Sequence, residues 1–184
     1  VVVKSFEDFY SKTGVKLKLE IEPGTFLVAN AGSLITKVID IVKTSDYEFI
    51  KIDAGMTEIT RPSLYGAQHP IIVVPNQNFE DEGRRGVKDY IVVGHCCESG
   101  DILTPGKGDS ESLKPRKLLE ARIGDYLVIE GVGAYCSSMS TKNYNSFPEA
   151  SEFLIDLDNN IHIIRKKQIL DQIIQNEIIP EFMK

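Results

Sequence analysis

Residues 90–101 read YIVVGHCCESGD, an apolar run that leads into a turn bounded by glycines. The run at 90–93 predicts a strand, because short apolar segments rich in β-branched and aromatic residues favour buried sheet positions. A loop that directly follows a strand is a common place for reactive groups. In this loop the thiol of Cys97 stands beside the carboxylate of Glu98. The stretch therefore predicts both a β-rich fold and a candidate site.

The surrounding sequence is also β-like from residue 26 onward. Segments rich in Val and Ile, separated by turn residues, occur at 26–29, 34–43, 48–53, 71–74, 89–94, 126–130 and 153–164. Residues 157–161 predict a hairpin turn. Two polar stretches, 76–88 and 104–115, are expected to be loops, the second of them mobile. The predicted fold is mainly β, a barrel or sandwich.

The two ends of the chain have a different pattern. Ser5 is predicted to open a short helix through a capping box, and Gly14 is expected to end it. Residues 15–21 alternate between apolar and charged types, which predicts a strand. Residues 1–30 are thus expected to be an α/β piece and residues 31–184 the β-rich domain. A helix is predicted over 166–179, where isoleucines fall on one face.

Composition narrows the class of protein. Hydrophobic residues make up 42% of the chain and charged residues 26%, as in soluble globular proteins. The net charge of −6 argues against partners such as nucleic acid or anionic membranes. No apolar run reaches the roughly 20 residues of a membrane span, and the three cysteines form neither a disulfide framework nor a zinc motif. We expect a cytoplasmic protein, and the start at Val1 leads us to expect the C-terminal portion of a longer chain.

Five sequence blocks occur together in one order. They are Glu22-Pro23-Gly24 with Ala29-Asn30-Ala31-Gly32, then Asp53-Ala54-Gly55-Met56, then Arg61-Pro62 with Leu64-Tyr65-Gly66, then Cys97-Glu98-Ser99-Gly100-Asp101, and last Gly133-Ala134-Tyr135 with Met139-Ser140 and Asn143-Tyr144-Asn145-Ser146. This series resembles the alanine-racemase-like decarboxylases that use pyridoxal 5'-phosphate (PLP), and the diaminopimelate decarboxylases in particular. The resemblance implies a C-terminal β-barrel or sandwich domain with a terminal helix at 31–184, preceded by the last α/β piece of a PLP-binding TIM-like barrel at 1–30. It also implies a homodimer with shared active sites.

The resemblance assigns roles to residues that would otherwise be unremarkable. Glu22, Gly24 and Tyr135 would bind the cofactor, with Glu22 at the pyridine nitrogen and the Tyr135 hydroxyl on the phosphate. Cys97 would be the catalytic proton donor, since an unperturbed thiol has a pKa of about 8.5, near working pH. Taken alone, Glu22 would be a polar turn residue and Cys97 a small buried hydrophobe.

Substrate binding falls, by the same resemblance, to Arg61, Tyr65, Glu98 and Tyr135. An arginine offers a fork of donors that suits a distal carboxylate, and Glu98 suits a distal ammonium group. Meso-2,6-diaminopimelate carries both groups on its remote carbon. The implied reaction is its decarboxylation to L-lysine and CO₂, the last step of lysine biosynthesis.

Two departures from the family pattern keep alternatives open. Thr25 stands where the family has an arginine after Glu-Pro-Gly, so the substrate could instead be arginine, ornithine, carboxynorspermidine or a carrier-bound amino acid. The cofactor-binding lysine and the glycine-rich phosphate cradle match nothing in this chain, so we expect it to be inactive alone. The third interpretation is a non-catalytic regulatory homologue. The retention of the predicted site residues argues against it, namely Glu22, Cys97, Glu98 and Tyr135.

Overall fold

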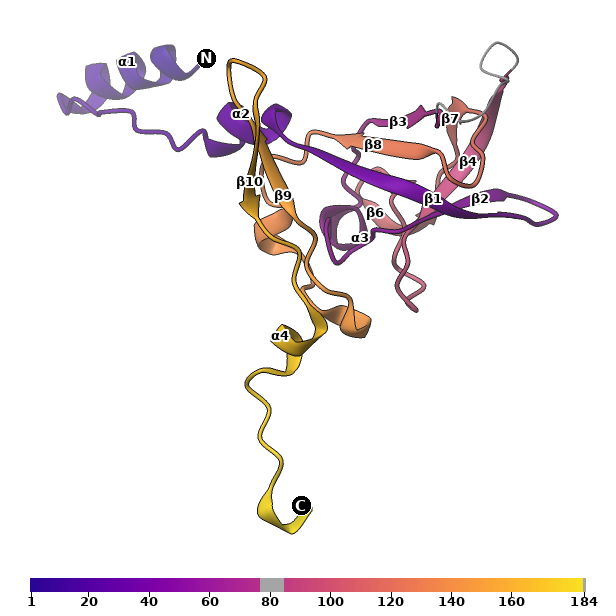
Figure 1. Ribbon diagram of the computed structural model, residues 1–184. Coiled ribbons are helices and arrows are strands. Elements are labelled where there is room, and N and C mark those ends of the chain that lie inside the picture. The colour runs from indigo at the N-terminus through magenta and orange to yellow at the C-terminus, as the bar shows by residue number, and fades with distance from the viewer. Residues whose placement is uncertain (77–84, 184) are drawn as a thin grey trace.

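The computed structural model describes residues 1–76 and 85–183, which form a β-rich body from which both chain ends project (Figure 1). The helical elements are α1 (Val2–Thr13), α2 (Gly24–Val28), η1 (Ala29–Ala31), α3 (Arg61–Tyr65), η3 (Ser137–Met139), η4 (Tyr144–Ser146), α4 (Leu170–Ile174) and η5 (Glu181–Met183). The strands are β1 (Ser33–Lys43), β2 (Glu48–Ile52), β3 (Ile71–Val74), β4 (Val87–Val93), β5 (Pro105–Gly106), β6 (Asp109–Leu113), β7 (Arg116–Leu119), β8 (Tyr126–Glu130), β9 (Glu152–Ile155) and β10 (Ile161–Arg165).

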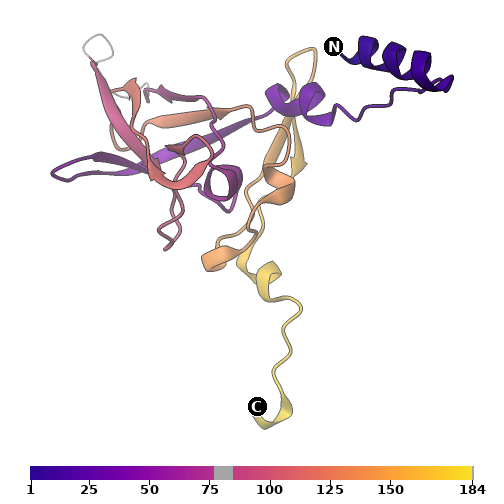
Figure 2. The same cartoon turned by 180° about the vertical axis from the view of Figure 1, so that it is seen from behind.

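Six of these strands form one sheet in the order β3-β8-β1-β2-β4-β7. Strand β1 pairs antiparallel with both β8 and β2, while β2 and β4 run parallel. The two outer strands, β3 and β7, also contact each other, so the sheet curls into a nearly closed barrel (Figure 2). The predicted mainly β, barrel-like fold is confirmed.

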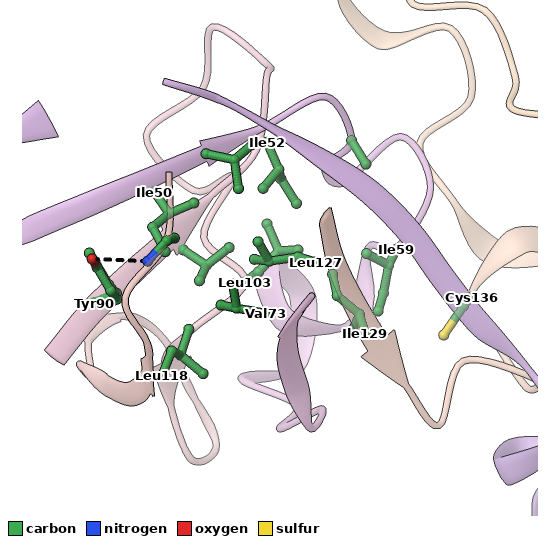
Figure 3. Close-up of a cluster of buried hydrophobic side chains, with 14 residues drawn as sticks. Ile50, Ile52, Ile59, Val73, Tyr90, Leu103, Leu118, Leu127, Ile129 and Cys136 are labelled. Carbon is green, nitrogen blue, oxygen red and sulfur yellow. Dashed lines mark hydrogen bonds between the residues drawn. The ribbon is translucent and has the colours of Figure 1, made fainter. Parts of the chain in front are cut away.

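The core fills the inside of this curled sheet (Figure 3). Along β1 and β8 the buried residues alternate with exposed ones, as the two-residue period of a strand requires. Ile50, Leu127 and Tyr90 are fully buried, and the Tyr90 hydroxyl accepts a hydrogen bond from the backbone N–H of Ala121 at 3.3 Å. Burial raises the pKa of Tyr90, so this phenol is neutral at physiological pH.

A buried ion pair joins the segment before β4 to the turn before β8. Arg85 donates to the Asp125 carboxylate, and the two side chains are 1% and 0% exposed. Asp125 also accepts the backbone N–H groups of Asn76 at 3.0 Å and Arg122 at 2.7 Å. Burial by itself raises the pKa of Asp125, but these donors outweigh it and hold the pKa below its ordinary value. The carboxylate is therefore fully charged and ties together segments that are distant in sequence.

The N-terminal segment departs from three predictions. Helix α1 ends at Gly14, with φ of 70°, as predicted, but it begins at Val2, and the predicted Ser5 cap is wrong because Ser5 lies inside the helix and donates to the Val1 carbonyl. The strand predicted at 15–21 is wrong as well, because this segment pairs with no strand of the described chain. The strand predicted at 26–29 is instead the end of α2 and the start of η1. Alternating apolar and charged residues indicate that an extended segment has two different faces. Such a segment is a strand only if its backbone pairs with another strand.

Elsewhere the predicted strands are confirmed with small shifts at their ends, and the 157–161 turn joins the β9–β10 hairpin. The predicted mobile loop at 104–115 contains the β5–β6 hairpin, and strand β7 was not predicted. Helix α4 covers only 170–174 of the predicted 166–179. Of the loop predicted at 76–88, residues 77–84 lie outside the described chain, and β4 already begins at Val87.

The projecting segments carry much exposed apolar surface. No residue of α1 is buried, and a groove of about 530 Å³ lies between α1 and the following segment. The β9–β10 hairpin exposes Phe153, Ile155 and Ile163 by 55% to 64%. None of the helices in the described chain is both long enough and apolar enough to span a membrane.

Candidate functional site

The turn at 94–101 is built on the most buried part of the sheet. Ile91 and Val92 of β4 are fully buried, and the turn closes where the Gly94 N–H donates to the Asp101 carbonyl at 2.9 Å. The Asp101 N–H in turn donates to the Glu98 carbonyl at 3.1 Å. Cys97 and Glu98 lie exposed at the tip of this turn, so a rigid strand presents them to the outside.

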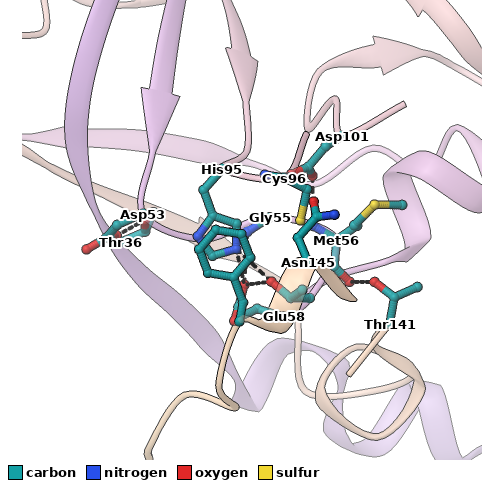
Figure 4. A network of polar contacts seen from close by, with 12 residues as sticks. Thr36, Asp53, Gly55, Met56, Glu58, His95, Cys96, Asp101, Thr141 and Asn145 are labelled. Atoms are coloured by element: carbon teal, nitrogen blue, oxygen red, sulfur yellow. Dashed lines mark hydrogen bonds and ion pairs between the residues drawn. The ribbon is translucent and has the colours of Figure 1, made fainter. Parts of the chain in front are cut away.

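The Asp101 side chain anchors the turn (Figure 4). Asp101 is 3% exposed, and its carboxylate accepts the backbone N–H groups of Met56 at 2.7 Å and Cys96 at 2.9 Å. The glycines on either side are required, since a Cβ atom at Gly55 or Gly94 would lie 2.3 Å or 2.1 Å from an Asp101 carboxylate oxygen. The 94–101 turn is thereby fixed to the turn that follows β2.

We expect Gly94→Ala to destabilise the fold by about 1–3 kcal/mol, because the added methyl group must displace the Asp101 carboxylate from its backbone donors. Gly100→Ala in the same turn is the matched control, since its Cβ would meet only Glu98 Oε1 at 3.5 Å, an ordinary contact. Urea unfolding of both variants measures the difference. Equal stability of the two variants would contradict the role given to Asp101.

A second set of polar contacts lies beside the first. The hydroxyl of Thr57 donates to Glu58 Oε2 at 2.7 Å, so His95, whose Nε2 is 2.8 Å from the same hydroxyl, must be its donor. The His95 ring stacks on the Phe147 ring, with 3.6 Å between the ring centroids and 7° between the ring planes. Burial lowers the pKa of His95 and raises that of Glu58. His95 is therefore a neutral packing residue between two turns.

The three cysteines occupy different environments. Cys97 is exposed, Cys96 is partly buried and Cys136 is buried. Burial, together with the nearby Asp101 carboxylate, raises the pKa of the Cys96 thiol to about 12. Burial also raises the pKa of Cys136. Only Cys97 combines a place in the turn with access to solvent.

Iodoacetamide at pH 8 should therefore alkylate Cys97 and leave Cys96 and Cys136 largely unmodified over the same time. Alkylation requires the thiolate, and the raised pKa keeps Cys96 and Cys136 as thiols. Fragmentation mass spectrometry of the peptide that contains residues 96 and 97 distinguishes the two neighbours. Modification of Cys96 at the rate of Cys97 would contradict this assignment.

Glu98 is exposed and held as a carboxylate. Its Oε1 accepts the Gly100 N–H at 3.1 Å and the Ser99 hydroxyl at 3.3 Å, and its Oε2 accepts the Tyr144 hydroxyl at 3.1 Å. The Gly100 N–H and the Tyr144 hydroxyl lower the pKa of Glu98. Glu98 is thus a fixed negative charge next to Cys97.

Arg61 and Tyr65 are the first and last residues of α3, a short helix that ends at Gly66 with φ of 60°. Arg61 is partly buried and Tyr65 is exposed. The helix is tied to the rest of the site through Thr60, whose hydroxyl donates to the Met56 carbonyl at 2.8 Å and accepts the Thr141 N–H at 3.0 Å. Since the Met56 N–H donates to Asp101, α3 and the Cys97 turn share one support.

Tyr135 lies in a segment that packs against the start of the sheet. Its φ of 56° is unusual for a tyrosine and its side chain is 57% exposed. Just before it, the Gly133 N–H donates to the Ala29 carbonyl at 2.9 Å, and a Cβ at Gly133 would lie 1.9 Å from the Val28 carbonyl oxygen. This close approach places the segment that carries Tyr135 next to the end of α2.

Glu22 and Gly24 lie at the other end of α2. Both are exposed, and the Gly24 N–H donates to the Glu22 carbonyl at 2.9 Å. The exposed carboxylate of Glu22 and the exposed phenol of Tyr135 fit the needs of PLP for a partner at its pyridine nitrogen and for a phosphate donor. The structure thus groups the expected residues as Cys97 with Glu98, Arg61 with Tyr65, and Tyr135 near α2.

Several contacts of the site were missed in the sequence. Tyr144 and Asn145, which belong to the fifth sequence block, reach across to the Cys97 turn, and Asp101 and Thr60 support it from within. For Tyr144, Asn145 and Asp101 the available signal was their presence in the blocks, whereas Thr60 lies outside the blocks. Nothing in local sequence indicates that residues 97 and 145 are neighbours.

Residues 9–133 match the family model described as the C-terminal sheet domain of the pyridoxal-dependent decarboxylases. The diaminopimelate decarboxylase of Buchnera aphidicola subsp. Baizongia pistaciae is 41% identical over 167 residues, a match that covers 88% of this chain and 38% of that protein.

Solved structures give the same result. A crystal structure of a diaminopimelate decarboxylase superimposes with a TM-score of 0.80 at 36% identity and covers 95% of this chain and 40% of its own. The diaminopimelate decarboxylase from M. jannaschii, in complex with L-lysine, has a TM-score of 0.78 at 30% identity and covers 100% of this chain and 38% of its own. This chain therefore spans well under half the length of the relatives that it matches.

Proposed function

The chain belongs to the pyridoxal-dependent decarboxylases, and we propose that it is the part of a diaminopimelate decarboxylase that carries the proton donor and the substrate-binding residues. The whole enzyme would convert meso-2,6-diaminopimelate to L-lysine and CO₂. The observation that carries the proposal is the fixed turn at 97–98, which presents an exposed thiol beside a charged carboxylate on a common support with α3.

Each proposed residue has a role that follows from its chemistry. When bound, PLP supplies the sink for the electron pair that remains when CO₂ leaves. Glu22 would hold the pyridine nitrogen and Tyr135 the phosphate, with Gly24 at the start of α2 allowing close approach. Cys97 Sγ would then give its proton to the carbon that has lost CO₂ and would regain a proton from solvent.

The far end of the substrate would be held by Arg61, Tyr65 and Glu98. Glu98 Oε2 accepts the Tyr144 hydroxyl, and a carboxylate oxygen has about two acceptor positions. The free position on Oε2 suits a distal ammonium group, while the Arg61 guanidinium suits the distal carboxylate. This combination favours meso-diaminopimelate over substrates that carry only one of these groups.

The test is CO₂ release by the full-length protein that contains this chain, loaded with PLP and offered meso-diaminopimelate, ornithine, lysine, arginine and carboxynorspermidine. Strong preference for meso-diaminopimelate supports the proposal. Preference for a substrate without a distal carboxylate would contradict it and would direct attention to Thr25, which replaces the arginine expected after Gly24.

We expect Arg61→Ala in that enzyme to lower kcat/KM for meso-diaminopimelate roughly 10- to 100-fold, the range of a lost charge-assisted hydrogen bond. Arg61→Lys keeps the charge without the fork and should recover part of the loss. Ornithine, which has no distal carboxylate, is the matched control substrate. A loss of the same size for both substrates would show that Arg61 supports the fold rather than the substrate.

For the domain arrangement we propose that residues 1–30 complete a PLP-binding barrel and that residues 31–184 are the sheet domain of a cytoplasmic homodimer. Support comes from the unburied α1, its groove and the exposed β9–β10 hairpin, because apolar surface of this extent marks an interface. Mixing inactive Cys97→Ala enzyme with an inactive variant of the PLP-binding lysine should restore activity if sites are shared. Heterodimers without activity would contradict shared sites.

A further inference from the structure

The loop at 143–147 reaches both exposed residues of the 94–101 turn. Asn145 Oδ1 accepts the backbone N–H of Cys97 at 2.8 Å, and the Tyr144 hydroxyl donates to Glu98 Oε2 at 3.1 Å. These two contacts come from neighbouring residues and end on neighbouring residues. One short loop therefore fixes the position of the thiol and of the carboxylate at once.

The backbone of this loop is held in an unfavourable conformation. Asn143, Asn145 and Ser146 have φ of 60°, 51° and 62°, in the left-handed region that residues with a side chain seldom adopt. Asparagine tolerates this region better than most residues. Strained backbone persists only where its surroundings hold it, and it gathers at functional sites. The three left-handed residues of this loop therefore suggest that the loop has a function at the site.

The surroundings that hold the loop can be named. The Asn143 side chain donates to the Phe147 carbonyl at 3.0 Å and to Gln168 Oε1 at 2.6 Å. Phe147 stacks on His95, which belongs to the Cys97 turn itself. The loop is therefore fixed at one end to the segment before α4 and at the other end to the turn that it positions.

We propose that the 143–147 loop is the positioning element of this active site, with Asn145 setting the direction of the Cys97 thiol and Tyr144 setting the place of the Glu98 carboxylate. The proposal rests on the proposed function of Cys97 and Glu98. Neither loop residue needs to touch the substrate. Asn145 acts on the proton-donation step through Cys97, and Tyr144 acts on substrate affinity through Glu98.

The two contacts therefore have separate kinetic signatures in the PLP-loaded, full-length enzyme. Asn145→Gly keeps the left-handed backbone without strain and removes only the amide, so kcat should fall about tenfold with little change in KM. Tyr144→Phe removes only the hydroxyl, so KM for meso-diaminopimelate should rise about tenfold with kcat within twofold. Asn145→Asp keeps an acceptor oxygen and should recover most of the kcat that Asn145→Gly loses.

Matched controls exist in the same chain. Asn159→Gly makes the same change at another left-handed residue, with φ of 63° in the β9–β10 turn, and Tyr47→Phe removes a hydroxyl from the β1–β2 connection. Both should leave kcat and KM within twofold of the unaltered enzyme. Alkylation of Cys97 by iodoacetamide gives a readout that is independent of turnover. Asn145→Gly should change its rate at least threefold, and Tyr144→Phe should not.

The outcomes separate this proposal from the proposed function. If Asn145→Gly leaves both kcat and the alkylation rate within twofold, or if both loop variants lower kcat alike with no separation of KM, the positioning role is overturned. If the unaltered enzyme releases no CO₂ from any substrate offered, the proposed function fails, and the alkylation rates still decide whether Asn145 positions Cys97.

Discussion

Replacing Cys97 by alanine is expected to lower kcat for meso-diaminopimelate roughly 10²- to 10⁴-fold in the PLP-loaded, full-length enzyme. This is the range by which a placed acid accelerates proton transfer. The exposed thiol at the tip of the turn is the group available for that step, and alanine has no proton to give. KM should change little, because the substrate is held by Arg61 and Glu98. Steady-state assays of CO₂ release measure both quantities.

Cys96→Ala is the control for this experiment. The Cys96 side chain of the unaltered enzyme is partly buried and its thiol remains protonated, so kcat of the variant should stay within about threefold of the unaltered enzyme. Unfolding free energies of the Cys97 variant should lie within about 0.5 kcal/mol of the original, as for most exposed positions. A Cys97→Ala enzyme that turns over at the original rate would remove Cys97 from the mechanism.

The largest effect on stability is expected from Arg85→Met, which leaves the Asp125 carboxylate buried without its cation. Removing one partner of a buried ion pair costs about 3–5 kcal/mol, because the remaining charge stays in a medium of low polarity. The pair here is almost completely buried, and among the described residues Asp125 would keep the backbone donors of Asn76 and Arg122. Urea unfolding followed by circular dichroism gives the difference in free energy.

Two further variants serve as controls for the Arg85→Met measurement. Lys18→Met breaks an ion pair with Glu20 in which the side chains are 84% and 77% exposed, and it should cost less than about 1 kcal/mol. The double variant Arg85→Met with Asp125→Leu removes both charges and should recover much of the stability lost in the single variant. A single variant as stable as Lys18→Met would show that water reaches Asp125.

Local sequence predicted the strands of the sheet well, because their apolar residues indicate which positions are buried inside the curled sheet. The same signal failed at 15–21, where alternation exists but the described chain offers no strand to pair with. It failed again at 104–115, where Gly106 and Gly108 indicated a loop and in fact turn the tight β5–β6 hairpin. Pairing is a property of the whole sheet, so the sequence of one segment cannot determine it.

The site was predictable to a similar degree. The turn that carries Cys97 and Glu98 follows from a strand that ends in glycine, and the structure places both residues at its exposed tip. The anchoring of that turn by Asp101, and its contact with Asn145, depend on segments brought together from far along the chain. Such contacts produce no periodic pattern in the sequence, and only the co-occurrence of the sequence blocks indicated them.

The pairing of β1 with β8 has a consequence for how this protein forms. Ser33 lies opposite Glu130, so β1 cannot complete its hydrogen bonds until residue 130 has left the ribosome. Closing so long a loop before it gains contacts makes such a sheet slow to fold, on the scale of milliseconds to seconds. During that interval the unpaired edge of β1 is open to other chains. Since Asn145 comes later still, the Cys97 turn acquires its contact with the 143–147 loop only after residue 145 has emerged.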